Sequence, residues 1–134
     1  MPTRQREAIV TTPYSIVILC VDDEENPLHL RKLVLQKNGF RVETATSARM
    51  ALDILTCSHV DLVLSDQLMP GGTGTELAQQ IKSRRPDLPV VLLSGVNEIP
   101  ADADFVDLFV SKVEGPRALC EHISEVLAKR GILM

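Results

Sequence analysis

The sequence lacks the features of membrane-spanning, secreted and nucleic-acid-binding proteins. No apolar run approaches the roughly 20 residues that a membrane span needs, and no signal-peptide pattern opens the chain. The net charge of -4 gives no support for direct binding of nucleic acid. The three cysteines have neither paired spacing nor metal-ligand spacing with the three histidines, which indicates reduced thiols. We therefore expect a cytoplasmic protein that binds neither membranes nor nucleic acid.

The chain also lacks internal repeats, low-complexity tracts and interdomain linkers, which favours a single domain. Apolar residues make up 45% of its 134 residues, enough for a hydrophobic core. Residues 1–13 are polar and contain two prolines. We expect them to form a flexible lead-in before a domain at 14–131, with a short tail at 132–134.

Five short, mainly apolar runs predict five β-strands. The runs cover 14–21, 40–45, 60–66, 88–93 and 106–111, and turn-forming or charged residues follow them. The first run is nearly all apolar and β-branched, which is typical of a strand buried on both faces of a parallel sheet. The second alternates loosely and predicts an edge strand.

The segment after the first strand predicts an α-helix. It begins in the acidic stretch 24–27, where negative charges favour the amino end of a helix, and it ends at about Lys37 before Asn-Gly. Helical spacing places Leu30, Leu33 and Val34 on the inner stripe of this helix.

Helical spacing also follows the second, third and fifth strands. Ser47 is a plausible N-cap of the second helix, Gly74 begins the third, and Pro116 opens a last helix that Gly131 ends. Between them, the connection 95–105 contains a proline and allows a fourth helix of one or two turns at most.

Alternation of strands and helices predicts an α/β fold. The strands form a mostly parallel, doubly wound sheet with right-handed crossovers and helices on both faces. In such sheets, ligands bind at the carboxyl ends of the strands. Residues that follow the strands are therefore the candidates for chemistry.

Chemically active residues follow four of the five strands: Asp22 and Asp23, Asp66, Ser94, and Lys112. Three neighbouring carboxylates repel one another unless a cation joins them, and Mg²⁺ prefers such hard oxygen ligands. A carboxylate nucleophile with a divalent cation, a lysine and a hydroxyl predicts a phosphoryl-transfer site. Asp66 would become an aspartyl-phosphate there.

These residues resemble the response-regulator receiver domain of two-component, or phosphorelay, signal transduction. Asp-Asp, Asp-x-x-Met-Pro-Gly, Ser-Gly and Lys follow the first, third, fourth and fifth strands in the family's order, and the likeness covers 15 to about 130. The resemblance implies a flavodoxin-like strand order 2-1-3-4-5. It also implies a phosphoprotein, not a turnover enzyme, that receives its phosphoryl group from a sensor histidine kinase or a phosphotransfer protein.

By position, the resemblance implies a role for each residue of a metal site. Asp66 would be the phosphoacceptor and Asp23 a direct ligand of Mg²⁺ or Mn²⁺. Asp22 would act largely through water, and the backbone carbonyl of Leu68 would complete the site. Phosphorylation would then change the surface offered to a downstream protein target, and a homodimer remains possible.

The resemblance further implies that Ser94 and Lys112 bind the phosphoryl group and that Phe109 is the aromatic switch residue. Leu68 and Val96 stand where the family tunes dephosphorylation. Because neither side chain can orient an attacking water, we expect slow self-dephosphorylation, with a half-life of hours.

One departure from the family follows the lysine. Val113 stands where family members usually have a proline on a cis peptide bond. A cis bond before a non-proline residue costs roughly 3 kcal/mol, so we expect a trans peptide and an altered loop after Lys112.

Simpler interpretations of single residues stay open. The acids at 22–25 also suit the start of a solvated helix, Asp66 suits a turn, Ser94 can cap a turn, and Phe109 can be a core residue. The glycines at 71–75 lack the lysine of a phosphate-binding P-loop, so we interpret them as a turn and a helix start.

Two other functions compete with a phosphoacceptor. One is a Mg²⁺-dependent phosphatase that uses an aspartyl-phosphate, although its acids would have a different spacing. The other is a receiver-like interaction module that is not phosphorylated. The chain ends just after the last helix, so it either acts by itself through a partner or is a piece of a longer protein.

Overall fold

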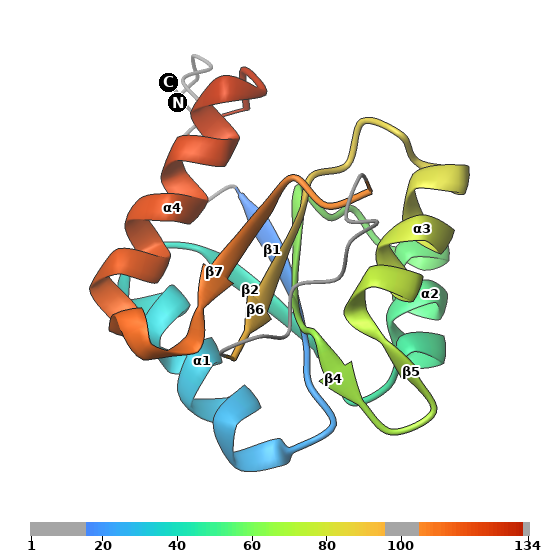
Figure 1. Ribbon diagram of the computed structural model, residues 1–134. Helices are drawn as coiled ribbons and strands as arrows, with labels where there is room; N and C mark the ends of the chain where they lie inside the picture. Colours follow the sequence, from blue (N-terminus) through green and yellow to red (C-terminus); the bar gives the residue numbers. More distant parts are fainter. Residues whose placement is uncertain (1–15, 96–104, 133–134) are drawn as a thin grey trace.

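The computed structural model describes residues 16–95 and 105–132, which contain a five-stranded parallel sheet between two layers of helices (Figure 1). The strand order β2-β1-β3-β6-β7 confirms the predicted order 2-1-3-4-5. The strands are β1 (Val17–Val21), β2 (Arg41–Ala45), β3 (Leu62–Asp66), β6 (Val90–Ser94) and β7 (Leu108–Ser111).

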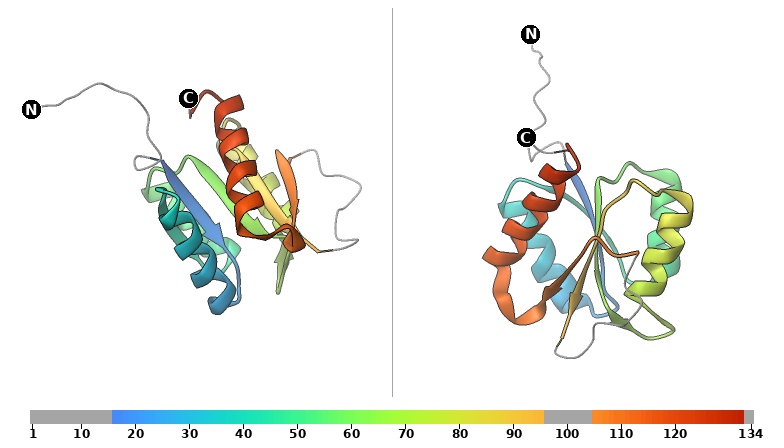
Figure 2. Two further views of the ribbon diagram at one scale, coloured as in Figure 1. Left: turned by 90° about the vertical axis from the view of Figure 1, so that its left-hand side faces the viewer. Right: turned by 45° about the horizontal axis from the view of Figure 1, so that its top comes forward.

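The helices cover both faces of the sheet, as predicted. α1 (Glu25–Lys37) and α4 (Gly115–Lys129) cover one face, while α2 (Ala48–Cys57) and α3 (Gly74–Arg84) cover the other (Figure 1; Figure 2). Within the described part of the chain, no helix combines the length and the hydropathy that a bilayer crossing requires.

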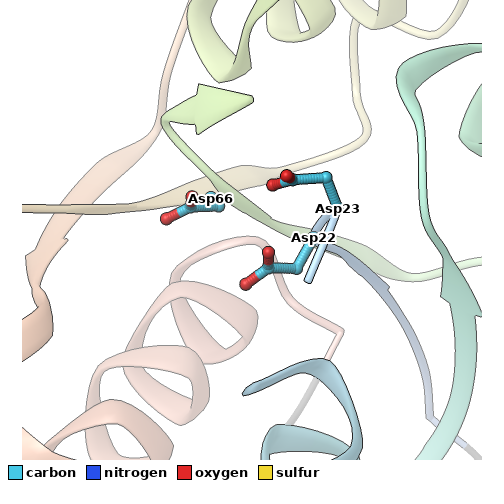
Figure 3. Close-up of side chains that lie close together, drawn as sticks. All are labelled: Asp22, Asp23 and Asp66. Carbon is cyan, nitrogen blue, oxygen red and sulfur yellow. The ribbon is translucent and has the colours of Figure 1, made fainter. Parts of the chain in front are cut away.

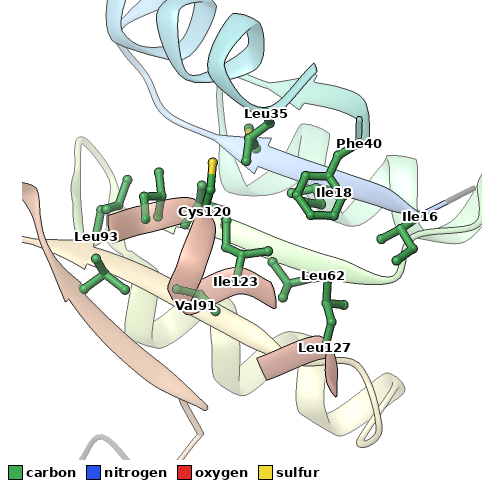
Figure 4. Packing of buried hydrophobic residues seen from close by; sticks show 14 of the residues in the cluster. Ile16, Ile18, Leu35, Phe40, Leu62, Val91, Leu93, Cys120, Ile123 and Leu127 are labelled. Carbon is green, nitrogen blue, oxygen red and sulfur yellow. The ribbon is translucent and has the colours of Figure 1, made fainter. Parts of the chain in front are cut away.

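Alternation along the central strands fills the two apolar layers. In β1, Ile18 and Cys20 face the layer under α1 and α4, whereas Leu19 and Val21 face the layer under α2 and α3. Figure 4 shows the first of these layers, in which Ile123 of α4 lies among side chains from the sheet. All five residues of β1 are buried, whereas β2 alternates between exposed and partly buried positions before the buried Ala45, as expected of an edge strand.

The predicted inner stripe of α1 was wrong at two positions. Leu30 and Leu33 are 62% and 48% exposed, and the buried residues of this helix are Leu28 and Leu35. The apolar residues between positions 28 and 35 fit two different helical stripes, so periodicity alone cannot choose between the stripes. Packing against the sheet and α4 selects the stripe that contains Leu28 and Leu35, and Val34 lies partly buried beside it.

Local signals placed the helix ends correctly. The Ser47 hydroxyl accepts a hydrogen bond from the amide of Met50, as an N-cap does. α3 begins after a capping box between Thr73 and Glu76. The sequence did not predict the short hairpin before it, formed by β4 (Leu68–Met69) and β5 (Gly72–Thr73).

The segment after Lys112 forms a short 3-10 helix, Lys112–Glu114, that leads into α4. No peptide bond in residues 16–95 or 105–132 is cis, so the bond between Lys112 and Val113 is trans, as predicted. The predicted lead-in at 1–13, Val96 and most of the expected irregular connection at 95–105 lie outside the described residues.

Asp107 joins several elements at the amino ends of β6 and β7, at the end of the sheet opposite the three carboxylates. Its Oδ2 accepts hydrogen bonds from Lys82 Nζ of α3 at 2.8 Å and from the Val90 amide of β6 at 2.7 Å. Arg130, directly after α4, pairs with the other oxygen. Burial raises the pKa of Asp107, but these three donors outweigh that effect and hold the pKa below its usual range.

We expect Asp107→Asn to lower the free energy of unfolding by roughly 1–3 kcal/mol at pH 7, because Lys82 and Arg130 lose their shared negative partner. The contribution of a carboxylate with a lowered pKa exists above the pKa of the unfolded chain and is lost as pH falls through the folded-state pKa. The difference from wild type should therefore shrink below about pH 4.

Urea unfolding at several pH values measures this difference. Asp53→Asn on the exposed face of α2 is the matched control, and it should change stability little at any pH. Equal stability of Asp107→Asn and Asp53→Asn at pH 7 would contradict the assigned role.

Candidate functional site

The three predicted carboxylates meet at the carboxyl ends of β1 and β3. These strands are parallel neighbours, and Val21 of β1 lies opposite Ser65 of β3. Asp22 and Asp23 therefore project beside Asp66, and one oxygen of each carboxylate lies within 4.8 Å of the others (Figure 3). In Figure 3 the three side chains project to the same side, with their carboxylates close together.

Asp22 is the most firmly held of the three acids. Its residue is only 3% exposed, and both carboxylate oxygens accept hydrogen bonds from the protein. The Glu24 amide donates to Oδ1 at 2.9 Å, and Arg31 Nη1 of α1 donates to Oδ2 at 3.0 Å. Asp23, in contrast, is exposed and faces the open side of the site.

Asp66 is buried, and its charge is paired with Lys112. Lys112 Nζ lies 2.6 Å from Asp66 Oδ1. Burial raises the pKa of Asp66, and the nearby Asp22 raises it further. Lys112 and Arg31 lower the pKa but do not cancel the rise. The site therefore disfavours the ionised form of its central carboxylate when no metal is present.

The backbone around Asp66 is packed against the first turn of α3. A Cβ on Gly74 would lie 2.6 Å from the carbonyl oxygen of Asp66 and 2.9 Å from a methyl group of Leu92, so only glycine fits there. The buried Gln67 carboxamide accepts hydrogen bonds from the amide and the hydroxyl of Thr75 at 3.0 and 2.9 Å. These contacts fix the peptide that carries the Asp66 side chain.

The other residues predicted for the site are Ser94, Phe109, Leu68 and Val96. Ser94 ends β6, is 3% exposed, and stands one residue beyond Leu93, which pairs with Asp66 in the sheet register. Phe109 of β7 is partly buried in the layer under α2 and α3. Leu68 is 53% exposed and lines the same cleft as Asp66. Val96 lies outside the described residues.

The sequence analysis missed Arg31 and Gln67. A signal for Arg31 was present, because it lies three residues after Leu28 and four before Leu35 on the inward stripe of α1. A charge on a buried stripe needs a partner, and Asp22 supplies it. Gln67 had a weaker signal, as a polar residue directly after a buried strand.

The donor set fits a hard divalent cation such as Mg²⁺. Three clustered carboxylates supply oxygen ligands, one of them exposed, on an open cleft. Further residues line this cleft beside the carboxylates, namely Glu24, Pro27, Arg31, Leu68, Met69, Pro70, Gly72, Thr73 and Lys112.

Residues 18–124 match the family described as "Response regulator receiver domain". The chain is 34% identical over 114 residues to the transcriptional regulatory protein GlrR of Escherichia coli K12, covering 82% of this chain and 26% of GlrR. It is 29% identical over 116 residues to the probable transcriptional regulator ycf27 of Cyanidium caldarium, covering 84% and 46%. The chain thus spans less than half the length of these curated relatives.

Solved structures of similar proteins share the fold. A response regulator receiver domain protein from Clostridium thermocellum has a TM-score of 0.80 at 29% identity, covering 89% of this chain and 99% of that chain. The response regulator TrrA from Thermotoga maritima, in complex with Mg²⁺ and BeF, has a TM-score of 0.78 at 32% identity, covering 84% and 99%.

Because the pKa of Asp66 is higher in the folded than in the unfolded chain, its ionised form destabilises the fold at neutral pH. We expect Asp66→Asn to raise the free energy of unfolding at pH 7, in excess EDTA, by on the order of 1 kcal/mol. The gain should shrink as the pH falls through about 4, because Asp66 then becomes protonated in the unfolded as well as the folded chain.

Thermal melts with EDTA and with Mg²⁺ test this expectation. Asp87→Asn, at an exposed position, is the control. Mg²⁺ should stabilise the wild type more than Asp66→Asn, because the variant lacks one carboxylate of the cluster. If Asp66→Asn melts at a lower temperature than the wild type in EDTA, the result would argue against a destabilising charge at Asp66.

Proposed function

The chain belongs to the response regulator receiver domain family, and we propose that Asp66 accepts a phosphoryl group in a two-component signalling pathway. The observation that carries this proposal is the pairing of the buried Asp66 carboxylate with Lys112 beside two further acids. A buried carboxylate at the open end of a sheet, between a cation and a metal-binding cluster, is suited to act as a nucleophile toward phosphorus.

In the proposed transfer, a phosphohistidine of a sensor kinase or phosphotransfer protein is the donor. An oxygen of Asp66 forms a bond to phosphorus while the bond from phosphorus to the imidazole nitrogen breaks, and the imidazole leaves with the electron pair. Lys112 offsets the negative charge of the transferred oxygens. The Ser94 hydroxyl, at the end of the neighbouring strand, donates a hydrogen bond to one of them.

Asp22, Asp23, Asp66 and the backbone carbonyl of Leu68 would hold Mg²⁺, or Mn²⁺ in its place. When bound, the cation supplies positive charge that offsets the charge of the phosphoryl oxygens. Asp22 is already fixed by hydrogen bonds from Glu24 and Arg31, so its proposed role is to orient a metal-bound water. Asp23 is exposed and suits a direct ligand.

Phosphorylation would act as a switch by biasing two arrangements of the surface. The phosphoryl group draws the Ser94 hydroxyl inward, and Phe109 on the adjoining strand follows it. The changed surface then binds a downstream protein or a neighbouring domain in the cytoplasm. The relatives GlrR and ycf27 are named as transcriptional regulators, so an output in transcription is the favoured case.

Incubation of the protein with acetyl phosphate and Mg²⁺ should add the mass of one phosphoryl group, because acetyl phosphate can donate directly to the Asp66 carboxylate. Intact-protein mass spectrometry measures the gain. Asp66→Asn should remain unmodified, and EDTA should suppress the gain in wild type.

Asp53→Asn is the matched control and should be modified like the wild type. An unmodified wild type would support an interaction module that is not phosphorylated. Steady turnover of a generic phosphoester such as p-nitrophenyl phosphate would instead support a phosphatase.

The phosphorylated protein should lose its phosphoryl group slowly, with a half-life of hours, because the apolar Leu68 cannot orient an attacking water beside Asp66. Leu68→Asn should shorten the half-life several-fold, since an amide can hold that water. Mass spectrometry after removal of acetyl phosphate measures the decay. Leu33→Asn, the same substitution at another exposed leucine, should leave the half-life unchanged. Decay of the wild type within seconds would refute the expectation.

A further inference from the structure

Besides Lys112, the site contains a second basic residue, which does not contact the phosphoryl group in the transfer proposed above. Arg31 reaches from α1 to Asp22, with Nη1 3.0 Å from Oδ2. The side chains of Arg31 and Asp22 are only 14% and 5% exposed, so the pair is largely shielded from water. Shielding strengthens the attraction and makes either charge costly without the other.

The position of Arg31 on the helix directs its side chain toward the sheet and Asp22. Arg31 shares the inward stripe of α1 with Leu28 and Leu35, whose side chains are buried. Rotation of α1 would expose both leucines, so the guanidinium cannot swing away with the helix. Arg31 also lines the cleft that contains Asp66, and its charge lowers the pKa of that carboxyl.

The pair changes the net charge that a metal ion meets. The carboxylates of Asp22, Asp23 and Asp66 contribute three negative charges, and Lys112 and Arg31 contribute two positive charges. Among these five side chains one net negative charge remains, whereas the three acids with Lys112 alone would carry two. The metal-free site is therefore closer to neutral, and a divalent cation gains less on binding.

We propose that Arg31 is a positioning residue that acts as a resident counter-ion of this site: it fixes Asp22, stabilises the metal-free fold and weakens the binding of Mg²⁺. The proposal rests on the proposed function, namely that the carboxylate cluster binds a divalent cation. Asp22 also accepts a hydrogen bond from the Glu24 amide, so we expect removal of Arg31 to change the charge of the site more than its shape.

The test compares Mg²⁺ dissociation constants, measured by isothermal titration calorimetry, with melting temperatures in EDTA. Arg31→Met, which keeps the length and loses the charge, should bind Mg²⁺ about tenfold more tightly and melt at a lower temperature without metal. The two changes have opposite signs. A merely structural defect would weaken metal binding together with the fold, so the tighter binding identifies the counter-ion role.

Matched variants keep the test decisive. Lys32→Met removes the same charge from the next position of α1, which faces another direction, and should leave Mg²⁺ affinity within about twofold of wild type. Arg31→Lys restores the charge and should return the affinity toward wild type. Arg31→Gln keeps a hydrogen-bond donor for Asp22, and it should also tighten Mg²⁺ binding if Arg31→Met does not fold.

Equal or weaker Mg²⁺ binding in the folded charge-removing variants, relative to Lys32→Met, would overturn the counter-ion role. That result would leave the proposed function intact, provided that the wild type binds Mg²⁺ and accepts a phosphoryl group from acetyl phosphate. A wild type that does neither would instead disprove the proposed function itself.

Discussion

The structure depends on one constraint. Carboxylates lie close together at the end of a buried sheet, and their charges repel one another. Asp22 and Asp66 are nearly inaccessible to solvent, and water cannot screen their charges. Each is paired with a basic residue from a different element, Arg31 from α1 and Lys112 from the end of β7. Asp23 has no such need because it is exposed. Asp22 and Asp66 are therefore buried and paired, whereas Asp23 is exposed and accessible to a ligand.

The two ends of the sheet differ in how completely their acidic residues are paired. At the amino ends of β6 and β7, Asp107 has donors from α3, from β6 and from Arg130 directly after α4, so its charge is paired within the protein. At the carboxyl ends, the acids outnumber the basic residues that contact them. A network whose charges are all paired adds stability. An excess of negative charge lowers stability and leaves a site suited to a cation.

The sequence was sufficient for the architecture and for the acids of the site, because strands of a parallel sheet must end at one edge. It was insufficient for α1, where apolar residues fit two stripes and only packing chose Leu28 and Leu35 over Leu30 and Leu33. The same error hid Arg31, whose inward direction becomes visible only on the correct stripe. The Gln67 contact with Thr75 depends on a loop geometry that no periodic pattern encodes.

Gly74 has a consequence for how this chain tolerates change. Its missing side chain leaves room for the carbonyl oxygen of Asp66, and even a methyl group at this position would have to displace that peptide or push α3 from the sheet. A residue without functional groups therefore sets where the Asp66 carboxylate lies. In a survey of random substitutions, position 74 should behave like an active-site position, although it carries no charge and contributes no ligand. The restriction at position 74 comes from lack of room for a side chain.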